Sequence, residues 1–545
     1  MQQPEAAASR RRSRWSDRTR RRLAGPLGLV GAALLTVVSA CSVGPSTRPP
    51  VAIDGGGAES PGGPTSSATE IPPLDRAPAD RLGWSDCADS TRERLGDAGA
   101  ATTLTFECVR MQAVLDPPSR PGRGSLRISL LKAGTGAVPL VLVNDAAGEP
   151  GTLAAARLAT QLPAQFFETF SLIGMDRRGT GDSEAARCVS PEVRDQIIGY
   201  DPGSTDVTGL LETARKASQE CVLDLDDRLA ALDTWRAAAD LETLRESLGV
   251  SRLNAIGRGE GSRVLTTYGS RYPNRVGRVV LDGALDPTAD ATGQAENRAI
   301  GAEQAFDAFA ADCVAHNCPL GTDPRQAVRD LLDQLRGQRV PGGDRPGGAG
   351  VDAVPLTAGT ALRAILRGLE DRSAWSRLAE AIAAARTGSG NALTAWAAPL
   401  VLDSSQDDPP LLDGELVTGC NDTASRLPPE QVSKLAQDWQ TKHPLFGVLF
   451  AQQLVLCGPW PVPAQPLPDT DLAGAPPVLV LSTAADPVVP AAATERAAQH
   501  LSQAVLVSWQ GGGHGAFPRV SCTTTLVQRF LVDGQVPEDG TVCPP

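Results

Sequence analysis

The stretch that decides the fold is residues 253–264, which reads LNAIGRGEGSRV. Its first half is short and apolar, as expected of a buried strand, and the residues that follow continue in a helical pattern. Glycines occur at positions 257, 259 and 261, where the strand-like pattern ends and the helical pattern begins. Small residues are needed there because the turn is strained and the strand and helix pass close together. The segment therefore predicts a sharp strand-to-helix junction.

Around this junction, strand-like and helix-like segments alternate from about residue 104 onward. Such alternation predicts an α/β fold, with a mostly parallel sheet of eight strands covered by helices on both faces. The strand-like runs are residues 104–115, 125–131, 138–144, 171–175, 252–256, 278–281, 477–481 and 504–509. Helical patterns separate many of them, at residues 152–161, 210–229, 235–248 and 491–503. Between 288 and 415 the strand signal fades, and we expect a helical insertion where a lid would lie.

Composition limits the function classes. The chain has 545 residues, of which 41% are hydrophobic, so it can bury a large core. Its net charge of −12 argues against nucleic acid as the main partner, because phosphate binding needs a basic face. We expect a monomer without a cofactor.

The first 40 residues have the features of a secretory signal. A basic run precedes an apolar stretch, residues 23–40, which ends in Val38-Ser39-Ala40 directly before Cys41. This arrangement resembles a bacterial lipobox, in which Cys41 becomes the lipidated first residue of an exported, membrane-anchored lipoprotein on the extracellular face. The alternative is an uncleaved membrane anchor, which the short and Gly/Pro-interrupted apolar run disfavours. Residues 41–79 are rich in Gly, Pro and Ser and predict a disordered tether.

Ten cysteines remain after Cys41, an even number that implies disulfides in an exported protein. The sequence leaves the pairing open, along with the alternative of buried reduced thiols. Loop-closure entropy favours neighbouring cysteines as partners. No Cys-x-x-Cys or His-x-x-x-His spacing occurs, so we expect no metal site. The favoured pairs are Cys87–Cys108, Cys188–Cys221, Cys313–Cys318, Cys420–Cys457 and Cys522–Cys543.

The glycine junction also has the form of a nucleophile elbow, Gly-x-nucleophile-x-Gly, with position 259 at its centre. Asp486 follows the predicted strand at 477–481, and His514 lies in a glycine-rich loop after the last long strand. The chain order nucleophile, Asp, His is that of α/β-hydrolases. We expect Asp486 to orient His514.

These motifs together resemble the actinobacterial secreted tripeptidyl-aminopeptidase-like α/β-hydrolases over roughly residues 80–545. The resemblance includes DRRGTGDS at 176–183, LDGALDP at 281–287, the cysteine layout and the Asp486/His514 block. It implies an α/β-hydrolase core at residues 80–287 and 416–545, interrupted by the lid at 288–415. The implied activity is that of a serine peptidase or esterase acting on peptides or small ester-like ligands.

Two departures from that family concern the catalytic parts. Gly259 stands where the family has its nucleophilic Ser, and glycine has no side chain with which to attack a carbonyl. The predicted oxyanion region also differs, since the family's glycine-rich loop reads NDAAGEPG here at 144–151 and adds two acidic residues. The predicted oxyanion residues are Ala146, Ala147, Gly148 and Glu260.

Two function classes follow. One is a pseudohydrolase that keeps the fold and the cleft but has little or no activity. The other is an active peptidase or esterase that uses His514 and Asp486 with a non-standard nucleophile or an activated water. Ser262 is a poor substitute nucleophile, because one helical turn separates it from the elbow tip. From the sequence, Gly259→Ser is expected to place a hydroxyl within reach of His514.

Overall fold

The computed structural model describes residues 70–78, 81–338, 340, 342, 355–401, 409–462, 467–468 and 470–545. The predicted signal segment, Cys41 and the first part of the predicted tether lie outside these residues. Within the described part of the chain, no helix is long and apolar enough to cross a membrane.

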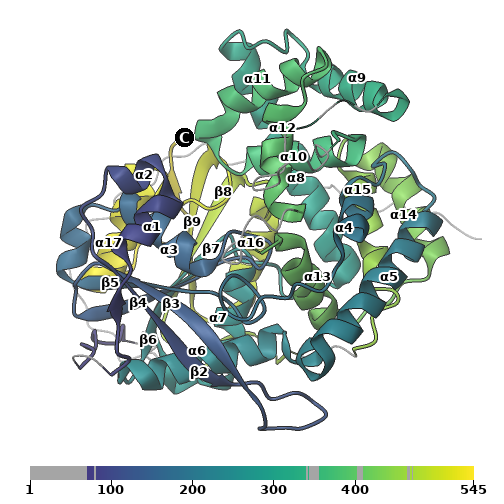
Figure 1. The fold of residues 1–545 in the computed structure, drawn as a ribbon. Helices are drawn as coiled ribbons and strands as arrows, with labels where there is room; N and C mark the ends of the chain where they lie inside the picture. The colour runs from purple at the N-terminus through teal and green to yellow at the C-terminus, as the bar shows by residue number, and fades with distance from the viewer. Residues whose placement is uncertain are drawn as a thin grey trace, which may run out of the picture. The chain divides into compact units, whose positions relative to one another are not determined.

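The fold is built on one mostly parallel sheet in the order β1-β2-β3-β5-β4-β6-β7-β8-β9-β10 (Figure 1). All eight predicted strands are confirmed, and two very short strands extend the edges. β2 pairs antiparallel with β1 and β3, and β3 pairs antiparallel with β5, while all other pairs are parallel. The strands are β1 Ser85–Asp86, β2 Phe106–Val114, β3 Ser125–Ala133, β4 Val138–Val143, β5 Phe170–Met175, β6 Leu253–Arg258, β7 Val276–Asp282, β8 Val478–Ala485, β9 Ala504–Gly512 and β10 Thr541–Cys543.

Helices cover both faces of the sheet. Successive side chains of a strand point to opposite faces, so each strand contributes to two apolar layers, one on each side of the sheet. In β4, Val141 and Val143 pack toward one layer, which includes α6, α7 and α16. Leu140 and Leu142 pack toward the other, which includes α1, α3 and α17. Burial on both faces explains why this strand is continuously apolar. The helices are α1 Ala88–Leu95, α2 Asp97–Ala100, α3 Gly151–Gln161, α6 Thr234–Leu248, α7 Glu260–Arg271, α16 Ala491–His500 and α17 Ser521–Gln528.

The helical insertion is longer than predicted. Among the residues described between β7 and β8, helices follow one another without a strand of the main sheet until β8 begins at Val478, and the last of these helices ends at Leu456. The predicted boundary at 415/416 is therefore wrong, since α13 runs through it and α14 and α15 also precede β8. Figure 1 shows most of these helices in green beside the sheet, together with α4 and α5, which precede α6. They are α4 Pro191–Ile198, α5 Thr208–Leu225, α8 Ala291–Ala315, α9 Pro324–Gly337, α10 Ala358–Leu369, α11 Trp375–Arg386, α12 Asn391–Val401, α13 Leu411–Asp422, α14 Pro429–Lys442 and α15 Gly447–Leu456.

The predicted tether also needs a correction, because residues 70–78 lie on the core. Ile71 and Leu74 pack against one apolar layer. The Asp75 carboxylate accepts the Ser251 amide hydrogen bond at 2.7 Å, and the Ala77 amide donates to the Ala137 carbonyl at 2.9 Å. This segment is therefore part of the folded domain.

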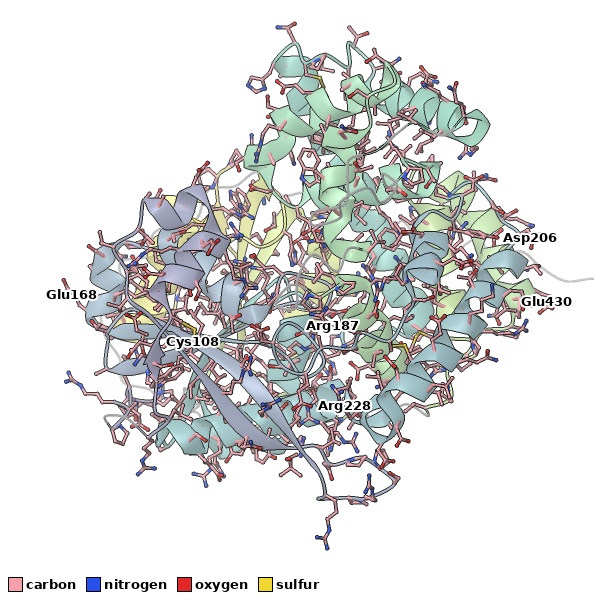
Figure 2. The ribbon with its side chains drawn as sticks, in the orientation of Figure 1. Cys108, Glu168, Arg187, Asp206, Arg228 and Glu430 are labelled. Atoms are coloured by element: carbon pink, nitrogen blue, oxygen red, sulfur yellow. A yellow bond between two sulfur atoms is a disulfide. The ribbon has the colours of Figure 1, made fainter. Side chains whose placement is uncertain are left out.

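All five predicted disulfides are present. The first joins Cys87 at the start of α1 to Cys108 on β2, which is labelled in Figure 2. The Cys420–Cys457 bond joins α13 to the end of α15, so it ties together two parts of the insertion.

Candidate active site

The β6–α7 junction has the geometry of a nucleophile elbow. Gly259 has φ 52° and ψ −119°, a backbone conformation that side chains rarely adopt. Close packing explains the two flanking glycines. A Cβ at Gly261 would lie 2.0 Å from the Val143 carbonyl oxygen, and one at Gly257 would lie 2.8 Å from the Leu265 side chain. The sequence prediction of a strained, tightly packed junction is thus confirmed.

Asp486 and His514 form the pair expected from their positions after β8 and β9. The His514 Nδ1 lies 3.0 Å from both oxygens of the buried Asp486 carboxylate. Amide groups of Val488, Val489 and Gly515 also donate to that carboxylate, so its orientation is fixed. This arrangement holds the imidazole with Nε2 toward the elbow, as an orienting carboxylate does in catalytic triads.

The third member of the site is Asp145, on the loop after β4. Its Oδ2 lies 2.9 Å from His514 Nε2, and its Oδ1 accepts the Glu260 amide hydrogen bond at 2.7 Å. A Cβ on Gly259 would lie only 2.1 Å from Asp145 Oδ1. The Asp145 carboxylate therefore occupies the nucleophile position, by which we mean the space that a side chain at residue 259 would fill.

Two carboxylates face one imidazole, and this sets the protonation state. Burial acts to lower the pKa of His514, but the charges and hydrogen bonds of Asp486 and Asp145 outweigh it, and the pKa lies well above 6.5. Burial likewise acts to raise the pKa of Asp145, but the His514 charge and hydrogen bonds lower it overall. The raised pKa of His514 favours the imidazolium form of the ring, and an imidazolium has no free nitrogen lone pair with which to accept a proton.

The predicted oxyanion region is also occupied by acidic groups. The Glu260 amide donates to Asp145, while the Ala146 amide donates to the Glu260 carboxylate at 3.2 Å. The carbonyl of Ala147 accepts from Arg367 at 3.1 Å, and the Gly148 amide donates to the Asp145 carbonyl at 3.2 Å. The amides nearest the elbow thus already bind negative oxygens, and a developing oxyanion would meet two carboxylates there.

Ser262, the substitute nucleophile considered from the sequence, has a structural role, and two other histidines lie in ion pairs or hydrogen bonds away from the elbow. The Ser262 hydroxyl donates to the Gly259 carbonyl at 2.6 Å and accepts from the Leu285 amide at 3.2 Å, so this buried residue fixes the elbow and does not supply a nucleophile. His316 pairs with Asp312, and His443 lies 3.4 Å from Glu296. No group of three or more metal-binding side chains occurs among the described residues.

A cavity of about 640 Å³ opens beside Asp145 and His514, and we call it the catalytic cavity. Its walls carry charges of both signs, and the helical insertion supplies part of them. The insertion also contacts the histidine loop directly, because the Glu370 carbonyl accepts the His514 amide hydrogen bond at 2.8 Å. Burial raises the pKa of the Glu370 carboxyl, which lines this cavity. Charged lining residues include Glu149, Arg157, Arg258, Arg367, Glu370 and Arg519.

The structure brings Gly259, Asp486 and His514 together, as expected from the sequence, and adds Asp145, whose contact with His514 the sequence did not predict. From the sequence, Asp145 is only one of two acidic residues near the predicted oxyanion region. The expectation that a serine at 259 would reach His514 is corrected by the structure, because Asp145 stands between them. The sequence did contain a signal for this contact. β4 and β6 are neighbours in the sheet, so the loops that follow them lie close together. The loop after β4 carries the Asp145 carboxylate, and the loop after β6 carries Gly259, which has no side chain.

Comparison with known proteins finds sequence similarity to peptidases and esterases. Residues 443–543 match the family model described as TAP-like protein. This C-terminal segment is similar to the TAP-like family. The serine protease Hip1 of Mycobacterium tuberculosis is 28% identical over 74% of this chain and 80% of its own length. Carboxylesterase B of the same organism is also 28% identical, over 88% of this chain and 94% of its own.

A third relative is a tripeptidyl aminopeptidase of Streptomyces lividans, 26% identical over 69% of this chain and 71% of its own length. The similarity to these proteins thus extends well beyond the segment that the family model matches. The chain therefore has an α/β-hydrolase fold and is similar over most of its length to proteins named as a peptidase, a protease and an esterase.

Proposed function

We propose that this protein is a non-hydrolytic member of the TAP-like group that binds a peptide or small ester-like ligand in the catalytic cavity. The observation that carries the proposal is the position of the Asp145 carboxylate, 2.9 Å from His514 and 2.7 Å from the Glu260 amide. That one group takes the place of the nucleophile and saturates an amide of the oxyanion region. Together with Asp486 it raises the pKa of His514 and so favours the cationic ring, which works against a third requirement of acyl transfer, a free base.

The cavity supports a binding role. Its volume of about 640 Å³ lies in the range of small-molecule sites. Arg157, Arg519 and Glu149 lie on its walls together with apolar residues such as Leu153 and Leu158. A short peptide, which carries both charges and apolar side chains, matches this mixture better than a purely apolar ligand does.

The proposal places the protein outside the cell membrane, held there by a lipid on Cys41. Its support is the sequence pattern that ends in Val38-Ser39-Ala40 before Cys41. Five disulfides in the folded domain agree with an exported protein, because disulfides persist in oxidising compartments.

Labelling with a serine-reactive fluorophosphonate tests the loss of activity. We expect no covalent adduct on the wild-type chain and only background hydrolysis of aryl esters and tripeptide anilides. Hydrolysis by wild type that disappears in His514→Ala would contradict the proposal.

A second candidate is an active hydrolase with Asp145 as the non-standard nucleophile. The observation that favours it is that Asp145 Oδ2 contacts His514 Nε2 where a serine hydroxyl would lie. Attack on an ester carbonyl would form a mixed anhydride as the C–OR bond breaks, the alkoxide would take the imidazolium proton, and water would hydrolyse the anhydride. This candidate predicts wild-type turnover that is lost in Asp145→Asn, whereas the first predicts no turnover in either chain.

A further inference from the structure

The loop that carries His514 is bound by the helical insertion as well as by the core of the fold. This histidine loop, residues 513–519, follows β9 and lies against the connection between α10 and α11. Asp371 and Gly513 pair as a single antiparallel bridge, and the His514 amide donates to the Glu370 carbonyl at 2.8 Å. The insertion therefore holds the backbone at His514 and at the residue before it.

An ion pair adds to this contact. Arg519, at the end of the histidine loop, donates to the Asp371 carboxylate at 3.1 Å and to the Glu370 carbonyl at 3.5 Å. The same carboxylate oxygen of Asp371 accepts the Ser373 amide at 3.0 Å, so its side chain is fixed at the start of the short helix Arg372–Ala374. The two ends of the histidine loop are thus bound to one ordered segment of the insertion.

Close packing against the insertion explains two glycines of the GGGHG sequence at 511–515. A Cβ at Gly513 would lie 2.8 Å from the Glu370 carbonyl oxygen, and one at Gly512 would lie 2.8 Å from the Trp375 ring. Both distances are shorter than real Cβ contacts, so a larger residue at either position would push the loop and the insertion apart. These glycines allow the loop to approach the insertion closely.

Trp375, which packs against Gly512, is itself held in the core of the insertion. Its side chain is buried, and its Nε1 donates to the Leu369 carbonyl at 3.3 Å. Its ring packs edge-on against Phe309 of α8, with the ring centroids 5.9 Å apart. The surface that the histidine loop meets is therefore set by packing inside the insertion.

The core holds the histidine loop from its other side. The buried Asp282 carboxylate, at the end of β7, accepts the amides of Ala516 at 2.7 Å and Phe517 at 3.3 Å. Arg258, which is ion-paired with Asp282, donates to the Phe517 carbonyl. The position of the His514 ring therefore depends on two supports, one from the core and one from the insertion.

We propose that Asp371 and Trp375 are positioning residues for His514. They hold the loop backbone so that each ring nitrogen meets a carboxylate, Asp486 at Nδ1 and Asp145 at Nε2. These distances are 2.9–3.0 Å, and a displacement of the loop lengthens and weakens both hydrogen bonds. The insertion is then part of the framework of the site. This inference goes beyond the proposed function and holds whether or not the site hydrolyses a ligand.

The charges around His514 make such a displacement measurable. Burial lowers the pKa of His514, but the two carboxylates at hydrogen-bond distance raise it overall, so a displaced ring should have a lower pKa. Beside Asp371 and Arg519, the charged groups near the ring or its loop are Asp145, Arg258, Asp282, Glu370 and Asp486.

Two variants separate positioning from direct electrostatics. Trp375→Leu changes no charge, so a change in the pKa of His514 reports a change in position. Arg519→Gln removes the partner of Asp371 together with a positive charge. Loss of that charge alone would raise the pKa of His514, whereas a displaced loop lowers it. Replacing Asp371 itself would be less informative, because losing a negative charge lowers the pKa by charge alone.

Nitrogen-15 NMR titration of the His514 ring in the whole chain is the test, with His514→Gln to assign the signal. We expect Trp375→Leu and Arg519→Gln each to lower the pKa by at least about 0.5, which is roughly a threefold change in the protonation constant. Thermal unfolding checks that each variant is folded. If Trp375→Leu does not fold, Arg519→Gln decides alone. An unchanged pKa in the folded variants, or a raised pKa in Arg519→Gln, would overturn the proposal.

Matched controls come from elsewhere in the insertion. Trp439 is a buried tryptophan of α14 whose ring packs on His443, and Arg325 of α9 is ion-paired with two carboxylates of α8. Trp439→Leu and Arg325→Gln should leave the pKa of His514 within about 0.2, because distant sites act independently. A fall as large in these controls as in Trp375→Leu would show a general loosening of the insertion and would overturn the assignment to Asp371 and Trp375.

Discussion

Gly259→Ser alone should not create a serine hydrolase, because the new side chain has no room. Its Cβ would lie 2.1 Å from Asp145 Oδ1, so the carboxylate must retreat by about 1 Å to reach an ordinary contact distance. That movement breaks the hydrogen bonds of Asp145 to the Glu260 amide and to His514. The substitution therefore removes the contacts that now organise the site.

The size of the effect follows from those contacts. Hydrogen bonds to charged groups contribute about 1.5–3 kcal/mol each, and a serine at positive φ costs about 1–2 kcal/mol, so the loss of two such bonds together with the strain should destabilise the fold by about 4–8 kcal/mol. A chain of 545 residues has an unfolding entropy near 1 kcal/mol per °C, from roughly 2.1 cal/mol/K per residue. The melting temperature of Gly259→Ser should therefore fall by about 4–8 °C in differential scanning fluorimetry.

The double variant Gly259→Ser with Asp145→Ala supplies the hydroxyl and frees the space for it. His514 then keeps only Asp486 as a carboxylate partner, so its pKa falls and it can act as a base. We expect fluorophosphonate labelling and aryl-ester hydrolysis at least about tenfold above both single variants. Adding Glu260→Ala should release the Ala146 amide and raise the rate further, by up to about 10²-fold. Full labelling of Gly259→Ser alone, without a drop in melting temperature, would refute this reasoning.

Three further predictions concern pH dependence, the disulfides and the N-terminus. His514 has a pKa raised above its unfolded value, so its contribution to stability is complete below pH 6.5 and is lost as the pH rises through the folded pKa. In melting curves recorded from pH 6 to 10, Asp145→Asn should move this loss of stability to lower pH. Peptide mapping without reduction should recover the five disulfides, each of which stabilises the fold by about 2–4 kcal/mol, and free thiols at several of the ten positions would contradict the pairing. Mass spectrometry of the N-terminal peptide should find a lipidated Cys41, and an intact leader with an unmodified Cys41 would contradict the anchor.

The fold was largely predictable because its signals are local. The apolar run of β4 and the glycines around position 259 each follow from packing within a few residues of the chain. The disulfide pairing was predictable for the same reason, since each pair closes a short loop. The order of Gly259, Asp486 and His514 along the chain then predicted that these residues lie together, and the structure brings them together.

Three features were not predicted, because they depend on contacts between residues that are distant in the sequence: the Asp145 contact, the packing of residues 70–78 and the length of the insertion. Asp145 and Glu260 are 115 residues apart, and only the pairing of β4 with β6 brings their loops together. The packing of residues 70–78 was hidden because two apolar anchors, Ile71 and Leu74, lie in a segment rich in Gly, Pro and Ser. The insertion was predicted too short because the position of α13 and α15 is set by packing on α12, α5 and α8, which the local sequence does not reveal.

The state of the His514 ring tests the central claim most directly. Nitrogen-15 NMR of the imidazole should show a cationic ring at pH 7.5 with both N–H groups hydrogen-bonded, one to Asp486 and one to Asp145. In Asp145→Asn the ring should titrate at a lower pH. A neutral wild-type ring at pH 7.5, with Nε2 unprotonated, would show that Asp145 does not occupy the nucleophile position and would contradict the account.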